Sequence, residues 1–445
     1  MKPILVLLLA SVPPMGWNSW DSYSMTVTEA QFKANAEVLA ARLRPFGWEY
    51  AVVDGGWYLQ NPARADKSEA FRFTMDDNGR YAPPTSRFPS AADGRGFRPL
   101  ADYAHSLGLR FGIHMIRGIP RGAVARNLPI ADSPWHAADA ADVSDVCPWN
   151  EDNWGVKPGP AGQAYYDSLA RLYASWGVDF LKVDCISDHP YKGGEIRMIH
   201  EALERAGRPI VLSLSPGPTA LEHAREVREY SQMWRISNDF WDHWGVWPGH
   251  EWSQGLRAQF ANAAEWAPLA EPGHWPDADM LPLGWLGPIP GEGGPDPRQT
   301  MLTHDEQRTL MTLWAVSRSP LIVGGNLTKL DDWTASLLTN PEVIAVDQHS
   351  ISSYRAIGDA STAVWLAWPD SGEGEYLAVF NLGDEARTVR YDWRELGLSS
   401  AANSVRDLWE RKDLGVATSF SARLAPHASV LYRVTAAAAS SAAPK

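Results

Sequence analysis

The chain has 445 residues, a net charge of −13 at pH 7 and an isoelectric point near 5.4. This length exceeds what one hydrophobic core usually supports, so we expect two domains, one of them large. The acidic balance argues against nucleic acid as a partner, because phosphate backbones bind positively charged surfaces, and two cysteines exclude a disulfide framework and any multi-cysteine metal site.

The N-terminal segment MKPILVLLLAS has one lysine, an apolar run from Ile4 to Ala10 and then the small Ser11. This is the layout of a short secretory signal. We therefore expect residues 1–11 to be a signal peptide and the protein to be secreted or periplasmic. No later stretch approaches the roughly 20 apolar residues that span a bilayer, so membrane insertion is not expected.

From residue 13 to about 340, helical patterns alternate with short apolar runs. In the first unit Thr28 and Gln31 have the spacing of a capping box, and Gly47 ends the helix before a strand. Eight such strands are predicted: MGWNSW, EYAVVD, LRFGIHM, VDFLKVD, PIVLSLS, MWRISND, HWPDADML and PLIVGG. Eight strands with intervening helices predict an α/β fold, a (β/α)₈ TIM barrel over residues 12–347.

The pattern changes after about residue 348. Short alternating strands now follow one another, separated by turn residues, as in TAVWLAWPDSGEGEYLAVFNL and HASVLYRV. This pattern predicts a small C-terminal antiparallel β-sandwich over residues 348–435. The last segment, AAAASSAAPK at 436–445, predicts a disordered tail.

Several predicted barrel strands end in acidic residues, and the C-terminal ends of the strands form the active face of such a barrel. Side chains alternate along a strand, so Lys182 points the same way as Asp184, and Arg235 the same way as Asp239. One aspartate at such a position is commonly a helix cap. Acids on four strands, two of them with a cation on the same face, favour a catalytic site instead. These acids are Asp54, Asp184, Asp239, Asp277 and Asp279.

Acids, cations and 22 tryptophans, without cofactor glycines or a metal-ligand cluster, favour carbohydrate chemistry with no cofactor and no metal. Glycoside hydrolysis needs one ionised and one protonated carboxyl group across the scissile bond. We assign Asp184 as the nucleophile because Lys182 favours its ionised form. We assign Asp239 as the acid/base because the aromatics of NDFWDHW favour a protonated carboxyl, although Arg235 opposes this. Trp57 of DGGWY is expected to stack on the sugar.

Six segments resemble, in order, the signature segments of glycoside hydrolase family 27, the retaining α-galactosidases and α-N-acetylgalactosaminidases. They are PPMGWNSWDSY, YAVVDGGW, WGVDFLKVD, RISNDFW, GHWPDADML and LTHDEQRTLMTLWAVSRSPLIVGGNL, and they run from residue 13 to about 347. The tail DLWERKDLG…HASVLYRV resembles the family's C-terminal β-sandwich. The resemblance implies a (β/α)₈ barrel, no cofactor, and double displacement through a glycosyl-enzyme with Asp184 as nucleophile and Asp239 as acid/base.

The resemblance also implies the residues that bind the sugar. Trp20 matches a residue that packs against the C6 side of the ring, and Asp54 matches an acid that binds hydroxyls near C4 and C6. Lys182 matches a donor to the C3 and C4 hydroxyls. The remaining matches are Arg235, near C2 and C3, and Asp279 with Met280, as a wall of the pocket.

The chain departs from the family pattern at several of these positions. Gly55 stands where α-galactosidases have a second acid, which leaves galactose specificity open. Ser215 stands where N-acetylgalactosaminidases have Ser and α-galactosidases Glu, but Pro218 nearby replaces a small Ala and opposes that inference. His114 replaces a Tyr. Segment 116–160 is longer than usual, and we expect it to form a loop over the cavity that narrows the choice of leaving group.

The family often has a disulfide beside the nucleophile. Cys147 and Cys185 are its counterparts here, and both a bridge and two buried thiols fit the sequence.

The resemblance ranks exo-hydrolysis of terminal α-D-galactosyl residues first, from oligosaccharides or glycoconjugates. Its rivals on the same scaffold are α-N-acetylgalactosaminidase, β-L-arabinopyranosidase and an isomaltodextran-type α-glucan hydrolase. A non-catalytic carbohydrate-binding barrel is the rival from another class; such relatives typically lose one of the two carboxylates, and both are present here. The sequence leaves the oligomeric state open, a homo-oligomer included.

Overall fold

The computed structural model describes residues 10–62, 71–287, 297–398 and 402–437. The chain forms two compact units, the first comprising Met1–Phe240, Pro272–Thr300 and Pro320–Asp332 and the second Trp241–Glu271, Met301–Ser319 and Trp333–Lys445. The greater part of the predicted signal peptide (1–11) and of the predicted tail (436–445) lies outside the described residues. Within the described residues, no helix is long and apolar enough to cross a membrane.

An eight-stranded parallel sheet forms the core of the first unit, in the order β10-β9-β8-β7-β3-β2-β1-β13. Leu281 pairs in parallel with Val323, and the N–H of Leu281 donates to the carbonyl of Ile322 at 2.7 Å, so the first and last strands also meet. The predicted eight-stranded barrel is confirmed. The strands are β1 (Met15–Asn18), β2 (Tyr50–Val53), β3 (Arg110–Ile116), β7 (Phe180–Asp184), β8 (Val211–Leu214), β9 (Met233–Arg235), β10 (Trp275–Asp277) and β13 (Leu321–Val323).

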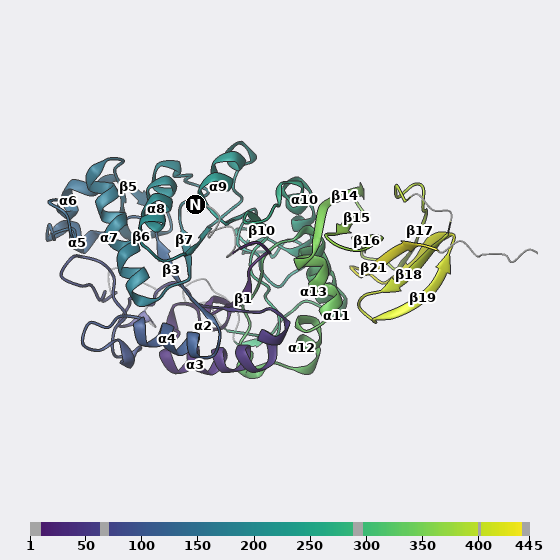
Figure 1. Cartoon of the computed structure of the whole chain (residues 1–445), viewed down its shortest axis with the longest axis horizontal. Helices are drawn as coiled ribbons and strands as arrows, with labels where there is room; N and C mark the ends of the chain where they lie inside the picture. The colour runs from purple at the N-terminus through teal and green to yellow at the C-terminus, as the bar shows by residue number, and fades with distance from the viewer. Residues whose placement is uncertain (1–9, 63–70, 288–296, 399–401, 438–445) are drawn as a thin grey trace, which may run out of the picture. The chain divides into compact units, whose positions relative to one another are not determined.

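Helices alternate with these strands (Figure 1). The predicted capping box is present: Thr28 and Gln31 cap α3, and Gly47, with φ of +98°, ends the helical segment in the left-handed conformation that glycine tolerates. The helices of the first unit include α2 (Trp20–Tyr23), α3 (Glu29–Val38), α4 (Arg98–Ser106), α7 (Pro160–Trp176), α8 (Gly193–Arg205) and α9 (Ala224–Tyr230). Strand β11 (Trp285–Leu286) pairs in antiparallel orientation with β12 (Arg298–Gln299).

Segment 116–160, expected to be a loop, has regular structure of its own. It contains α5 (Arg121–Ala125), α6 (Ala137–Ala140) and a three-stranded antiparallel sheet in the order β4-β6-β5. Its strands are β4 (Ile119–Pro120), β5 (Ala141–Cys147) and β6 (Asn150–Val156). We call β5 and β6 with their turn, residues 141–156, the β5–β6 hairpin. Two register shifts in this hairpin explain why no alternating strand pattern is visible in its sequence.

The second unit contains α10 (Leu256–Trp266), α11 (His304–Ser317), α12 (Asp332–Leu338), α13 (Pro341–Gln348) and two antiparallel sheets. The larger sheet has the order β14-β15-β16-β21-β18-β19, and β17 pairs with β20. Side chains of both sheets share one core, with Val364 and Leu377 from the larger sheet and Val389 and Phe420 from the smaller. The predicted β-sandwich is confirmed. Its strands are β14 (Ser350–Gly358), β15 (Thr362–Pro369), β16 (Glu375–Asn381), β17 (Arg387–Asp392), β18 (Asn403–Asp407), β19 (Lys412–Ala417), β20 (Ser419–Leu424) and β21 (Ser429–Ala436).

Candidate active site

The C-terminal ends of the barrel strands carry the predicted acids and cations. Lys182 and Asp184 lie in β7, Arg235 ends β9, and Asp54 directly follows β2. In the register of the sheet, His114 of β3 lies opposite Lys182. Because these strands are parallel, their C-terminal ends lie on one face of the barrel, where such enzymes have their active sites.

Asp54 is buried and held by three donors. Its Oδ2 accepts from Nζ of Lys182 at 2.9 Å and from Nδ2 of Asn18 at 2.6 Å, while Oδ1 accepts from the N–H of Gly55 at 2.7 Å. Burial by itself would raise the pKa of Asp54, but the Lys182 ammonium and these hydrogen bonds hold that pKa well below its usual range. Asp54 is therefore a fixed, ionised acceptor at the C-terminal face of the barrel.

Lys182 and Arg235 connect the other acids into one charged network. Burial alone would lower the pKa of Lys182, but the carboxylates of Asp54, Asp184 and Asp279 raise it. Arg235 Nη2 lies 2.7 Å from Asp279 Oδ2 and 3.2 Å from Asp239 Oδ1. Asp279 thus interacts with both cations, and the predicted nucleophile and the predicted acid/base belong to a single network.

Asp184, the predicted nucleophile, has one oxygen fixed and one directed towards His114. Oδ1 accepts from the N–H of Cys185 at 2.6 Å, and Oδ2 lies 3.5 Å from Nε2 of His114. Burial raises the pKa of Asp184, but His114, Lys182 and the Cys185 N–H together lower it below its ordinary value. With 24 % of its side chain exposed, Asp184 is an ionised carboxylate that a ligand can reach.

Asp239, the predicted acid/base, has a more open setting than its sequence context indicates. Its neighbours Phe240 and Trp241 are buried, but half of the Asp239 side chain is exposed. The expected enclosure by aromatic groups does not occur, because these rings are buried while the carboxylate, paired with the buried Arg235, is half exposed. This group can exchange protons directly with water.

A turn after β10 carries the predicted pocket wall. Asp279 has a φ of +87°, a rare conformation for a residue other than glycine, and it is held by hydrogen bonds on both of its carboxylate oxygens. Oδ2 accepts from the N–H of Phe240 at 2.8 Å and Oδ1 from the N–H of Met280 at 2.8 Å. Asp277 supports the turn by accepting the N–H of Asp279 at 2.9 Å, and burial raises the pKa of Asp277 to about 7.

Gly55, His114 and Trp20 come together at one side of this face. A Cβ atom added to Gly55 would lie 3.3 Å from Cε1 and 3.4 Å from Nδ1 of His114, and 3.5 Å from Cζ3 of Trp20. The His114 ring is buried, and its Nδ1 has no hydrogen-bond partner within the described residues. Imidazole and indole therefore stand where a side chain at position 55 would otherwise project.

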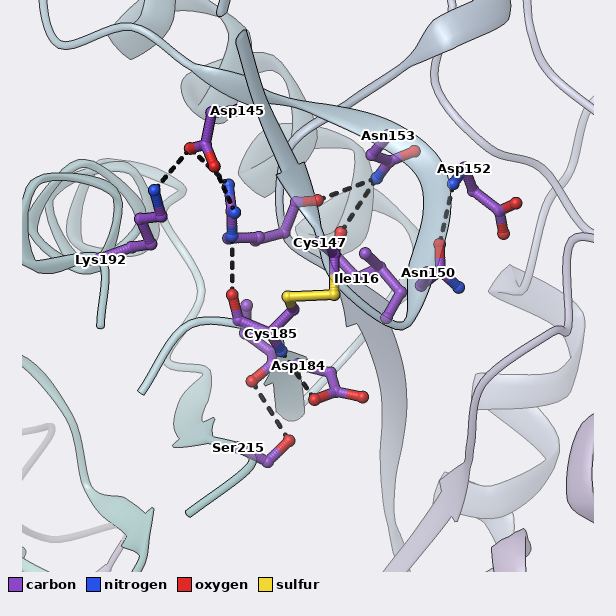
Figure 2. The surroundings of a disulfide bond; sticks show 12 residues. Ile116, Asp145, Cys147, Asn150, Asp152, Asn153, Asp184, Cys185, Lys192 and Ser215 are labelled. Carbon is purple, nitrogen blue, oxygen red and sulfur yellow. Dashed lines mark hydrogen bonds and ion pairs between the residues drawn. A yellow bond between two sulfur atoms is a disulfide. The ribbon is translucent and has the colours of Figure 1, made fainter. Parts of the chain in front are cut away.

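Ser215 and Trp57, two further predicted site residues, are both buried. Ser215 is buried beside β7, where its N–H donates to the carbonyl of Val183 at 2.8 Å, and Figure 2 shows it close to Asp184. Trp57 is 1 % exposed, and its Nε1 donates to the carbonyl of His114 at 2.7 Å. The prediction that Trp57 stacks on the sugar is wrong, because the Trp57 ring is buried. Trp57 is a core residue that supports the strand carrying His114.

In the structure Cys147 and Cys185 form a disulfide (Figure 2). Two residues of the site were not predicted from the sequence: Asn18, a partner of Asp54, and Arg117, whose Nε donates to the carbonyl of Cys185 at 2.7 Å. A polar residue at the end of a buried strand was the available signal for Asn18. Within the part of the chain that the structure describes, no three His, Cys, Asp or Glu side chains are grouped as metal ligands would be.

Comparison with known families matches residues 153–349 to the model described as "Alpha galactosidase A" and residues 359–434 to "Alpha galactosidase C-terminal beta sandwich domain". An α-galactosidase of Coffea arabica is 30 % identical over 442 residues, covering 98 % of this chain and 96 % of that protein.

Some solved structures are more similar in sequence than this relative. A GH27 β-L-arabinopyranosidase from Geobacillus stearothermophilus, crystallised as a single-substitution variant in complex with arabinose, has a TM-score of 0.92 and 45 % identity, covering 97 % of this chain and 99 % of that one. A putative α-N-acetylgalactosaminidase from Bacillus halodurans has a TM-score of 0.84 and 40 % identity, covering 96 % and 97 %.

Proposed function

The chain belongs to glycoside hydrolase family 27, and on that premise we propose that it is a retaining exo-glycosidase that prefers terminal β-L-arabinopyranosyl residues and accepts α-D-galactosyl residues second. The two sugars have the same configuration at C1 to C4 and differ in the hydroxymethyl group on C5, which only galactose carries. The preference therefore depends on how the protein treats that group.

The observation that carries the preference is the contact between Gly55 and His114. The resemblance to family 27 places a second acid of α-galactosidases at position 55, in the site that recognises an axial 4-hydroxyl or the 6-hydroxyl, and our proposal assigns it to the 6-hydroxyl. Here that position has no side chain, and the His114 ring lies within 3.4 Å of the space that a Cβ would fill. A galactoside would lose a charged hydrogen bond there, whereas a pentopyranoside loses nothing.

The α-galactoside is kept as second candidate because two residues expected to bind its hydroxyls are intact and joined at 2.9 Å. They are Asp54, expected near C4 and C6, and Lys182, expected at C3 and C4. Relatives named α-galactosidase, such as that of Coffea arabica, are also consistent with it.

The proposed reaction is a double displacement. The Asp184 carboxylate attacks C1 while Asp239 gives its proton to the leaving oxygen, which produces a covalent glycosyl-enzyme and the free alcohol. Asp239, now ionised, takes a proton from water as that water attacks C1, which releases the sugar and restores Asp184. The ionised state of Asp184 supports the first role, and the half-exposed position of Asp239 supports its exchange of protons with water.

The test is a parallel assay of nitrophenyl β-L-arabinopyranoside, α-D-galactoside, N-acetyl-α-D-galactosaminide and α-D-glucoside. We expect kcat/KM for the arabinopyranoside to exceed that for the galactoside by about tenfold or more. A higher value for the galactoside would overturn the preference. Early product of inverted configuration in an NMR time course, or turnover by Asp184→Ala, would overturn the mechanism.

We also propose secretion, supported by the apolar N-terminal run. The carbonyl of Ala10 accepts from the N–H of Gly273 and from Nε1 of Trp275, each at 2.8 Å. Cleavage after Ser11, the boundary expected from the sequence, would remove this acceptor, so we propose that a processed chain begins at or before Ala10. N-terminal sequencing of protein recovered from the medium and from cells tests both points.

A further inference from the structure

Arg117 donates hydrogen bonds to two successive backbone carbonyls, those of the nucleophile Asp184 and of Cys185. Its N–H donates to the carbonyl of Asp184 at 3.1 Å, and its Nε donates to the carbonyl of Cys185 at 2.7 Å. Cys185 has a φ of +61°, a conformation that residues other than glycine rarely adopt. The N–H of this same Cys185 donates to Oδ1 of Asp184. The orientation of the nucleophile's carboxylate thus depends on a peptide that needs external support.

The guanidinium of Arg117 is itself held by acids from two separate elements. Asp145 of the β5–β6 hairpin binds Nη1 at 3.0 Å and Nη2 at 2.9 Å, and Glu195 of α8 binds Nη1 at 2.8 Å. Lys192 adds a second cation, 2.8 Å from Asp145 (Figure 2). Two cations and two anions balance, and the Arg117 side chain is only 1 % exposed. A fork of donors with this geometry is specific to arginine, because lysine offers a single nitrogen.

The disulfide gives the same peptide a second link to the same hairpin. Cys147 and Asp145 are both in β5. Cys147 is bonded covalently to Cys185, and Asp145 binds Arg117, which in turn contacts Cys185. Figure 2 shows the disulfide between Cys147 and Cys185, with Asp184 next to Cys185. The hairpin is therefore joined to the nucleophile's turn both covalently and electrostatically.

We propose that Arg117 is a positioning residue for the nucleophile, fixing the Asp184–Cys185 peptide so that the Asp184 carboxylate faces C1, with Asp145 as the group that holds Arg117 in place. This inference rests on the proposed role of Asp184. Loss of the Arg117 fork lets the Cys185 peptide leave its left-handed conformation and withdraws the N–H from Oδ1. Sugar binding through Asp54 and Lys182 does not depend on that peptide, so attack is slowed while affinity stays.

The experiment compares Arg117→Lys with Arg208→Lys. Arg208 is a matched control because it does at the start of β7 what Arg117 does at its end: its Nε donates to the carbonyl of Val178 at 3.0 Å, and its Nη2 pairs with Asp179. We measure kcat, KM, the inhibition constant of the free product sugar and thermal stability. Arg117→Lys should lower kcat by about 10- to 100-fold with KM and the inhibition constant within about twofold, and Arg208→Lys should leave kcat within about twofold.

Asp145→Asn provides a second variant that leaves the buried Arg117 in place, and it should lower kcat by a smaller factor in the same pattern. If kcat of both variants stays within about twofold of the parent enzyme, or if kcat and the inhibition constant change together as in a general loss of structure, the positioning role is refuted. Failure of the proposed function would look different, because Asp184→Ala itself would then retain turnover.

Discussion

The size of the sugar pocket can be changed at Gly55. Its φ lies outside the left-handed range, so the backbone accepts a side chain, and the atoms in the way are the edge of the His114 ring at 3.3 and 3.4 Å. Gly55→Asp alone forces that ring to move by a few tenths of an ångström. In the double variant Gly55→Asp/His114→Ala the ring is gone, and the new carboxylate has room to face the C6 hydroxyl of a galactoside.

The expected gain is one hydrogen bond to a charged acceptor, about 1.5–3 kcal/mol. Since about 1.4 kcal/mol corresponds to a factor of ten, the ratio of kcat/KM for galactoside over arabinopyranoside should rise by roughly 10- to 100-fold in the double variant. The assay is the pair of nitrophenyl glycosides, measured with the parent enzyme, each single variant and the double variant. His114→Ala alone isolates the loss of the imidazole near Asp184.

A matched control for the backbone is Gly56→Ala. Gly56 has φ of +73°, and a Cβ there would lie 2.6 Å from Cβ of Met25, so this smaller substitution should destabilise the protein while Gly55→Asp does not. If the folded double variant keeps its arabinopyranoside activity and its substrate ratio stays within about twofold of the parent, position 55 does not face C6 and our reasoning on sugar preference is refuted.

Three further predictions concern the nucleophile Asp184, the disulfide and Trp57. The pKa of Asp184 is lowered on folding, so the reactive ionised form persists to lower pH than in an ordinary aspartate. His114→Phe should therefore move the acidic limb of kcat/KM to higher pH, and an unmoved limb would contradict the role of His114. Reduction of Cys147–Cys185, which closes a span of 38 residues, should lower the free energy of unfolding by up to about 4 kcal/mol in denaturant titrations with and without reductant. Trp57→Phe removes the donor to the buried carbonyl of His114 and should cost about 1–3 kcal/mol of stability with KM unchanged; a raised KM at full stability would instead indicate sugar stacking.

The sequence predicts the barrel and its acids well because both depend on short-range patterns. Apolar runs ending in aspartate place Asp54 and Asp184 at strand ends, and the two-residue period of a strand puts Lys182 on the same side as Asp184. The parallel order of the strands then brings these residues to one face. No further information is needed to predict a two-carboxylate site there.

Other features depend on contacts between distant segments and leave no such pattern. Arg117 meets Asp145 and Glu195 across separations of 28 and 78 residues, and nothing in their spacing links them. Trp57 lies among glycines, which indicates a loop, but its ring fills a core position because it packs on Phe97 and Trp176. Neighbouring residue types describe the backbone there and say nothing about the direction of the side chain.

The site combines two buried acids with one that is half exposed, and this contrast favours hydrolysis from a chain end. Asp54 and Asp279, which we expect to bind or enclose the first sugar, are 2 % and 5 % exposed, so their charges are held in fixed positions. Asp239, which shares Nη2 of Arg235 with Asp279, is half exposed, and in the proposed reaction the leaving alcohol departs and water enters beside it. An enzyme that needs water after the first displacement gains from such an opening, because a sealed site would hold the glycosyl-enzyme without its second reactant.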